Sequence, residues 1–260
     1  MCERSSESSA PIMAPRCPAV TAEQMREVDR IMTEDIGIDL ARMMEIAGKS
    51  LAELAIRLFE PDRVVVLAGS GGNGGGGLVA ARHLVNRGRA VNVVLAGHAA
   101  GLTGVPAEQY RILRRMGVPA ISWPDDGDPA ELTALAEGVD LIIDALLGYS
   151  LVGDPRGPAA ILIDWANSCD VPVLALDNPS GLDVTSGQLG HPCIRAAATL
   201  TLALPKRGLS APAPVGDLWL ADISVPAVVY QRLGIHVGDV FRDTSLVSLD
   251  DGGCVRSVGL

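Results

Sequence analysis

Short runs of apolar residues alternate along this chain with segments whose apolar residues recur at helical spacing. The β-branched and aliphatic runs predict buried strands at 64–67, 91–96, 120–123, 141–146, 173–176, 199–203 and 218–221. Helical spacing predicts helices at 39–59, 106–116, 129–136 and 159–168, and a capping box at Thr21 to Gln24 predicts an earlier one. Repeated strand–helix units with short connections indicate an α/β fold, a Rossmann-like three-layer α/β/α sandwich with a mainly parallel sheet.

The two ends of the chain lack this pattern. Residues 1–18 are rich in Ser, Pro and charge and have no apolar core of the kind found in signal peptides or membrane anchors, so we expect a disordered leader. Residues 243–260 are mixed, small and polar, and we expect a loose tail. Between them, 19–242 shows no internal repeat and no linker, which predicts a single domain.

Composition excludes several classes of function. The net charge of −10 and the pI near 4.8 leave no basic surface for nucleic acid. Five cysteines without a CxxC pair argue against both a zinc site and a disulfide framework, so we expect a reducing, cytoplasmic location and no membrane contact. Aromatic residues make up only 3% of the chain, so a core of Ala, Val, Leu and Ile is expected, which suits a parallel sheet.

A glycine-rich run at 69–77 follows the first predicted sheet strand and leads into a helix. Glycines allow positive φ and let a ligand approach the backbone closely, and the free N–H groups at a helix start favour an anion. The order strand, tight loop, helix therefore predicts a phosphate or pyrophosphate ligand. Close packing of the helix on the strand is the alternative reason for the glycines.

The spacing Gly69-x-Gly71-x-x-Gly74 also satisfies the dinucleotide fingerprint of dehydrogenases. That fingerprint requires an acidic residue about 20 residues further on, at the end of the second strand, to bind a ribose hydroxyl. Here the second strand ends in Gly97 and His98. We therefore expect that the nucleotide is not bound as in NAD dehydrogenases.

Polar side chains follow two later strands. Asp144 ends the fourth apolar run, while Asp177 and Ser180 follow the fifth. In a doubly wound sheet the ligand lies at the carboxyl ends of the strands, so these loops and the glycine run should converge. A single strand-end Asp is often only a helix cap or turn former, but two acids, a serine and a glycine loop together favour a ligand site.

Several segments resemble, in one order, the NAD(P)H-hydrate epimerase family. They are G-S-G-G-N-G-G-G-G-L-V-A-A-R-H at 69–83, D-A-L-L-G at 144–148, D-N-P-S-G-L-D at 177–183 and A-L-P-K-R-G-L at 203–209. The family's enzymes interconvert the R and S epimers of hydrated NADH and NADPH so that a dehydratase can repair the S form. The resemblance implies an isomerase with a dinucleotide substrate, a homodimer, and a separate dehydratase as functional partner.

The resemblance also implies a set of site residues. Lining the pyrophosphate would be Gly72, Asn73, Gly74, Gly75 and Gly76. Closing over the ligand would be Gly148, Tyr149, Ser150, Leu151, Val152, Gly153 and Asp154, with Asp177 near the reacting ring. Asn73, Asp144 and Ser180 match the family's ligands for one potassium ion per subunit, and an oxygen-only set suits such a hard cation.

Epimerisation at a carbinolamine carbon proceeds by loss and return of hydroxide or by ring opening. Either route requires a proton shuttle and a site that tolerates a cationic intermediate. Asp177 is the candidate catalytic residue, because it ends an apolar strand and should be partly desolvated. The alternative is that its carboxylate only caps the next turn. Lys206 is a weaker candidate, which we expect to be an exposed, solvated loop lysine.

The chain departs from the family pattern at two glycines. Gly72 stands where the family has Asn, and Gly76 stands where it has Asp. Two hypotheses follow. The chain is either a working epimerase with a relaxed glycine loop, or a divergent member that serves ligand binding, recruitment or a different reaction.

Overall fold

A mixed β-sheet forms the centre of the computed structural model, which describes residues 16–124, 127, 129–210, 212–250 and 252–256. The strands are β1 (Arg63–Ala68), β2 (Ala90–Ala96), β3 (Ala120–Trp123), β4 (Leu141–Ala145), β5 (Val173–Leu176), β6 (Ala198–Leu202), β7 (Asp217–Ala221), β8 (Leu246–Leu249) and β9 (Val255–Arg256). Within the described residues their order is β3-β2-β1-β4-β5-β6-β7-β8-β9. Strands β1 to β7 pair in parallel, and β8 and β9 are added antiparallel.

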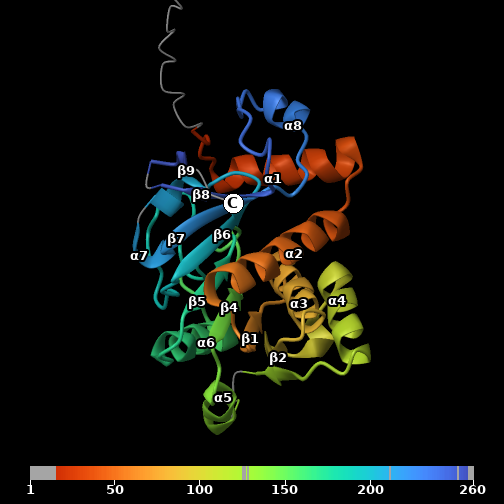
Figure 1. The fold of residues 1–260 in the computed structure, drawn as a ribbon, viewed down its shortest axis with the longest axis vertical. Helices are drawn as coiled ribbons and strands as arrows, with labels where there is room; N and C mark the ends of the chain where they lie inside the picture. The colour runs from red at the N-terminus through yellow and green to blue at the C-terminus, as the bar shows by residue number, and fades with distance from the viewer. Residues whose placement is uncertain (1–15, 125–126, 128, 211, 251, 257–260) are drawn as a thin grey trace, which may run out of the picture.

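Helices cover both faces of this sheet (Figure 1). They are α1 (Ala22–Arg30), α2 (Leu40–Phe59), α3 (Gly72–Val85), α4 (Gly104–Arg115), α5 (Pro129–Ala136), α6 (Gly157–Ser168), α7 (Pro212–Val215) and α8 (Ala227–Arg232). A π-helical segment, Ile31–Ile36, continues α1, and short 3₁₀ turns lie at Ala99–Gly101 and Arg207–Ser210. In Figure 1, α2 lies between α1 and α3.

Alternation along β1 shows how the sheet separates two cores. Val64 and Val66 pack in one hydrophobic cluster with residues of α2 and α3. Val65 and Leu67 pack in another cluster, which contains Leu162 of α6. Because successive side chains of a strand point to opposite faces, both faces of β1 are buried, as in a three-layer α/β/α sandwich. The predicted fold class is therefore confirmed.

The predicted strands and helices are confirmed with their ends shifted by one or two residues. The capping box at the start of α1 is also present. Gln24 N donates to Thr21 Oγ1 at 3.2 Å, and Thr21 N donates to Gln24 Oε1 at 3.0 Å. Among the described residues, no helix combines the length and the apolar character that crossing a membrane would require.

The expectation of a loose tail from residue 243 is wrong for β8 and β9. β8 pairs with β7, and its Val247 and Leu249 are buried in a cluster with Leu220 and Cys17. β8 contains only three apolar residues, within a mixed and polar segment, so the sequence pattern did not reveal this strand. Among the described residues, the cysteines at 17, 169, 193 and 254 are free.

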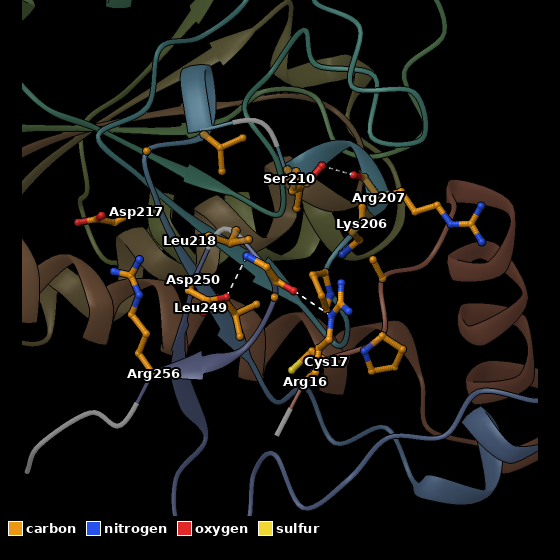
Figure 2. A pocket seen from close by; sticks show the side chains of 18 of the residues that line it. Arg16, Cys17, Lys206, Arg207, Ser210, Asp217, Leu218, Leu249, Asp250 and Arg256 are labelled. Atoms are coloured by element: carbon orange, nitrogen blue, oxygen red, sulfur yellow. Dashed lines mark hydrogen bonds between the residues drawn. The ribbon is translucent and has the colours of Figure 1, made fainter. Parts of the chain in front are cut away.

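The end of the predicted leader is also ordered. Figure 2 shows Arg16 and Cys17 beside Leu249 and Asp250. Arg16 Nε donates to Gly252 O at 3.0 Å, and Gly252 N donates to Asp250 Oδ1 at 2.9 Å. Residues 16–18 therefore join the C-terminal strands, whereas 1–15 and 257–260 lie outside the described residues.

Helices α2 and α3 approach closely through glycines, which brings the start of α3 to its position in the site. A Cβ at Gly48 would lie 2.5 Å from Val79 Cβ and 2.6 Å from Gly76 O. Neither neighbour is the free end of a long side chain, so the two helices can approach this closely only because residue 48 has no side chain.

We therefore predict that Gly48→Ala destabilises the fold, although helix propensity alone favours Ala by about 1 kcal/mol. Overpacking costs about 1–3 kcal/mol, so we expect the free energy of unfolding to fall by a net amount of up to about 2 kcal/mol. Urea denaturation measures the change. Gly101→Ala is the control, since a Cβ there meets nothing within 4 Å. A Gly48→Ala variant more stable than the wild type would contradict the close approach.

Candidate active site

A cavity of about 860 Å³ lies at the carboxyl ends of the parallel strands. It is lined by residues of the strand-end loops and by residues of α1, its π-helical continuation and α2. Its lining includes Met25, Asp29, Thr33, Met44, Gly71, Gly72, Asn73, Gly76, Gly148, Tyr149, Ser150, Asp177 and Lys206. The predicted convergence of the glycine loop with the loops after β4 and β5 is thus observed.

The glycines of the loop after β1 serve two different purposes. A Cβ at Gly69 would lie 2.0 Å from Leu146 O, and one at Gly74 would lie 1.8 Å from Gly69 O, so these two allow close packing. Gly71 and Gly72 line the cavity, and a Cβ at either would meet nothing within 4 Å. Gly69 and Gly74 therefore fit the packing explanation, while Gly71 and Gly72 leave the open space that a ligand would require.

The start of α3 offers backbone N–H groups to the cavity. Its N-cap is Gly71, and within the described residues no side chain caps the helix. The first helical hydrogen bond runs from Gly75 N to Gly71 O at 3.0 Å, which leaves the N–H groups of the preceding first-turn residues for a ligand. Together with the helix dipole, they form a site suited to an anion.

Not every glycine-loop residue named from the sequence reaches the cavity. Gly72, Asn73 and Gly76 line it, but Gly74 and Gly75 do not. Gly74 packs on Gly69, and a Cβ at Gly75 would lie 2.3 Å from Met44 Sδ. Helical geometry turns these two positions away from the cavity and into the helix–strand and helix–helix contacts.

Only part of the loop after β4 lines the cavity. Gly148, Tyr149 and Ser150 line the cavity, whereas Leu151, Val152, Gly153 and Asp154 are not among its lining residues. Val152 is 87% exposed, and Asp154 Oδ1 accepts a hydrogen bond from His191 N at 2.9 Å. In this structure, only the first half of the segment expected to close over a ligand therefore faces the cavity.

Asp144 and Ser180 are fully buried and bonded to each other. Ser180 Oγ donates to Asp144 Oδ1 at 2.6 Å, and Ser180 N donates to Asp144 Oδ2 at 2.7 Å. Ser180 Oγ also accepts a hydrogen bond from Leu147 N at 2.9 Å, which ties the loop after β5 to the loop after β4. Burial raises the pKa of Asp144 to about 6, and the hydrogen bonds from Ser180 and Leu146 oppose this rise.

Asn73 lies over the same loop. A Cβ at Gly148 would lie 3.4 Å from Asn73 Cβ, and Gly148 directly follows Leu147 in the chain. Asn73 Nδ2 is buried without a hydrogen-bond partner among the described residues. The structure therefore brings Asn73 to the loop that Ser180 contacts.

Asp177 lies at the centre of the strand-end loops. It is 4% exposed and has φ +66°, a left-handed conformation that is uncommon for residues other than Gly, Asn and Asp. Its carboxylate forms an ion pair with Lys206 Nζ, and its Oδ1 accepts a hydrogen bond from Leu202 N at 3.2 Å. The carboxylate of Asp177 therefore bonds to β6 and to the loop after β6, and not to the turn that follows Asp177. The structure does not support the alternative that this carboxylate only caps that turn.

The expectation that Lys206 is exposed and solvated is wrong, because Lys206 is only 2% exposed. Besides Asp177, its Nζ donates to Leu202 O at 2.9 Å and to Thr201 Oγ1 at 3.2 Å. The chain returns after β6 through Ala203 at φ +63°, and Lys206 pairs with Val20 in an isolated β-bridge. That turn directs the lysine inward, and no local sequence pattern signals it.

Asp29 and Tyr149 form a second polar pair in the cavity, which was not predicted from the sequence. The Tyr149 hydroxyl donates to Asp29 Oδ2, and both side chains line the cavity. Burial raises the pKa of Asp29, and the charge of Asp177 adds to this rise, while Tyr149 and Lys206 oppose it. The sequence contains a signal for Asp29, because Met25, Asp29 and Thr33 recur at i, i+4 and i+8 and therefore share one helix face.

The family described as "YjeF-related protein N-terminus" matches residues 40–208 of this chain. The chain belongs to this family. A relative from Dehalogenimonas lykanthroporepellens, named NAD(P)H-hydrate epimerase, is 44% identical over 223 residues, which cover 83% of this chain and 86% of the relative. A second protein of that name, from Truepera radiovictrix, is 37% identical over 218 residues, which cover 84% of this chain and 94% of the relative.

Longer relatives and a solved structure agree with this assignment. A "Bifunctional NAD(P)H-hydrate repair enzyme Nnr" from Salinibacter ruber is 36% identical over 241 residues, which cover 88% of this chain but 44% of that protein. The crystal structure of yeast ynu0 matches 89% of this chain and all of its own, with a TM-score of 0.78 and 26% sequence identity. The YjeF-related match includes the glycine loop, Asp144, Asp177 and Lys206, so the strand-end part of the cavity lies within the matched region, whereas Asp29 and the rest of α1 precede it.

The buried pair of Asp177 and Lys206 gives a stability prediction. Replacing Lys206 with Met leaves a buried carboxylate without its cation, which destabilises a fold by about 3–5 kcal/mol. We expect Lys206→Met to lower the free energy of unfolding by that amount in urea. The double variant Asp177→Asn, Lys206→Met should recover most of the loss, because the buried charge is then removed as well. Equal stability of Lys206→Met and the wild type would contradict a buried ion pair.

Proposed function

We infer that this chain is an NAD(P)H-hydrate epimerase, an isomerase that interconverts the R and S forms of hydrated NADH and NADPH. One observation carries the inference: a buried carboxylate–lysine pair and an uncapped helix N-terminus open into the same cavity of about 860 Å³. The first matches the need for proton transfer at the damaged ring, and the second matches the pyrophosphate. Relatives that bear the epimerase name support the same reading.

The dinucleotide would lie across the strand ends. Its pyrophosphate would accept hydrogen bonds from the first turn of α3, and its hydrated ring would lie against Asp177. Gly97 and His98, which end the region of the second strand, are not among the cavity-lining residues. We therefore expect the adenosine ribose to be held differently from that of a dehydrogenase, whose second strand ends in an acid.

The two glycine departures do not favour the alternative of a divergent binding or recruitment protein. A side chain at Gly72 would meet open space, so the Gly there widens the cavity and leaves the backbone unchanged. At Gly76, a Cβ would lie 2.7 Å from Leu176 Cδ2, so the leucine fills part of the space that the family's Asp would take. The candidates for proton transfer and cation binding, Asp177, Asn73, Asp144 and Ser180, are all present.

Potassium is the cation that the family resemblance implies, and the residues present fit it. Asp144 is a fully buried carboxylate, and among the described residues no Lys, Arg or His lies within salt-bridge distance of it. The unpaired Asn73 amide can present its oxygen in place of its nitrogen, because the two ends of an amide are nearly isosteric. Asn73, Asp144 and Ser180 would hold the ion, which would neutralise the buried charge beneath the glycine loop.

Two further features of the proposal come from the family resemblance alone. They are a homodimeric state and a separate dehydratase that consumes the S form. The proposed cytoplasmic location rests on the cysteine usage. The bifunctional name of the Salinibacter ruber relative is consistent with a functional link to a second repair activity.

The catalytic part of the proposal predicts that Asp177→Asn slows epimer exchange by roughly 10²-fold or more, because general acid–base catalysis contributes that much. NMR exchange between the R and S signals of hydrated NADPH measures the rate. Since the substitution also leaves Lys206 unpaired, the double variant Asp177→Asn, Lys206→Gln is measured beside it with its melting temperature. Wild-type rates in a folded double variant would refute the role of Asp177.

The potassium site predicts a cation-specific stabilisation. Potassium chloride should raise the melting temperature of the wild type above its value in tetramethylammonium chloride of equal ionic strength, because a ligand that binds only the native state stabilises it. Asp144→Asn should abolish the difference. Asp164→Asn, at an exposed aspartate of α6, is the control. Equal melting temperatures in the two salts for the wild type would rule out the site.

A further inference from the structure

Two polar pairs, which belong to different elements, line the same cavity. Asp177 and Lys206 belong to the loops after β5 and β6, on the sheet side. Asp29 belongs to α1, on the helix side, and is bonded to Tyr149 of the loop after β4. A ligand between α1 and the strand ends would therefore meet two carboxyl groups that different elements hold.

We propose that Asp29, assisted by Tyr149, is a second acid–base residue of the site, so that hydroxide leaves C6 of the hydrated ring on one side and water adds on the other. This inference rests on the proposed function and deepens it. The proposal favours hydroxide loss over ring opening. In ring opening the hydroxyl group loses its proton, the C6–N1 bond breaks and the ring nitrogen takes up a proton, so an acid and a base on two sides of the ring are not required.

The reaction has two stages, loss of the hydroxyl group from C6 and addition of water to C6. The carboxyl group on the side of the hydroxyl donates its proton to that oxygen, the C6–O bond breaks, and its electron pair leaves with water. The lone pair of N1 forms the C6=N1 bond of a cationic ring. A water molecule on the other side then adds to C6, returning that electron pair to N1, and gives its proton to the second carboxylate. The two carboxyl groups have exchanged protonation states, which proton exchange with solvent resets.

The charges around Asp29 suit this role. Tyr149 is its hydrogen-bond donor, the charges of Lys206 and Asp177 act on it, and Tyr230 also lies within electrostatic range. Burial raises the pKa of Asp29, which helps the carboxyl group to hold a proton. Asp177, paired with Lys206, supplies the ionised carboxylate that would stabilise the cationic ring.

The first test measures R to S exchange by Asp29→Asn and Tyr149→Phe. Asp29→Asn should slow exchange by roughly 10²-fold, as expected for loss of an acid–base group, while hydrated NADPH still raises the melting temperature. Tyr149→Phe should slow exchange less, because the carboxyl group remains. Glu23→Gln, at an exposed position of the same helix, is the matched control. Unchanged exchange in a folded Asp29→Asn variant would overturn the proposal.

The second test follows the oxygen atom. In H₂¹⁸O, each inversion by the wild-type protein should place solvent oxygen at C6, which mass spectrometry detects after subtraction of the spontaneous reaction. Inversion with retention of the original oxygen would overturn the proposal and leave the epimerase function standing. Exchange by the wild type no faster than the spontaneous rate would overturn both.

Discussion

The ion pair between Asp177 and Lys206 is the interaction on which the site depends. A carboxylate and an ammonium group, both almost removed from water, are tolerable only when they neutralise each other and their remaining donors and acceptors are bonded. The lysine meets this condition through Leu202 O and Thr201 Oγ1, so the end of β6 is fixed relative to the end of β5. The pair thus holds together the loops that form one side of the cavity.

Close backbone approach positions the other parts of the cavity. Gly69 and Gly74 let the loop after β1 pack against Leu146 O and against itself, and Gly48 lets α2 approach α3. These contacts place the uncapped start of α3 in the same cavity as Asp177, and α1 closes the far side with Asp29. The anion site and the proton-transfer groups are thereby held at fixed positions by the packing of the domain.

The elements of the sheet could be predicted from the sequence because the strands are buried on both faces and read as continuous apolar runs. The convergence of the glycine loop, Asp144 and Asp177 followed from parallel topology, which places all strand ends at one edge. Lys206 and β8 could not be predicted in the same way. The burial of Lys206 depends on a turn through Ala203 and on a partner 29 residues away in the chain, and β8 is stabilised by tertiary contacts with β7 and Cys17.

A crystal structure with hydrated NADPH bound tests the central claim most directly, because it locates both ends of the ligand at once. The account predicts the pyrophosphate at the N–H groups of Gly72 and Asn73, and the hydrated ring between Asp177 and Asp29. A ligand whose ribose is held at Gly97 and His98, or whose ring lies away from Asp177, would contradict it.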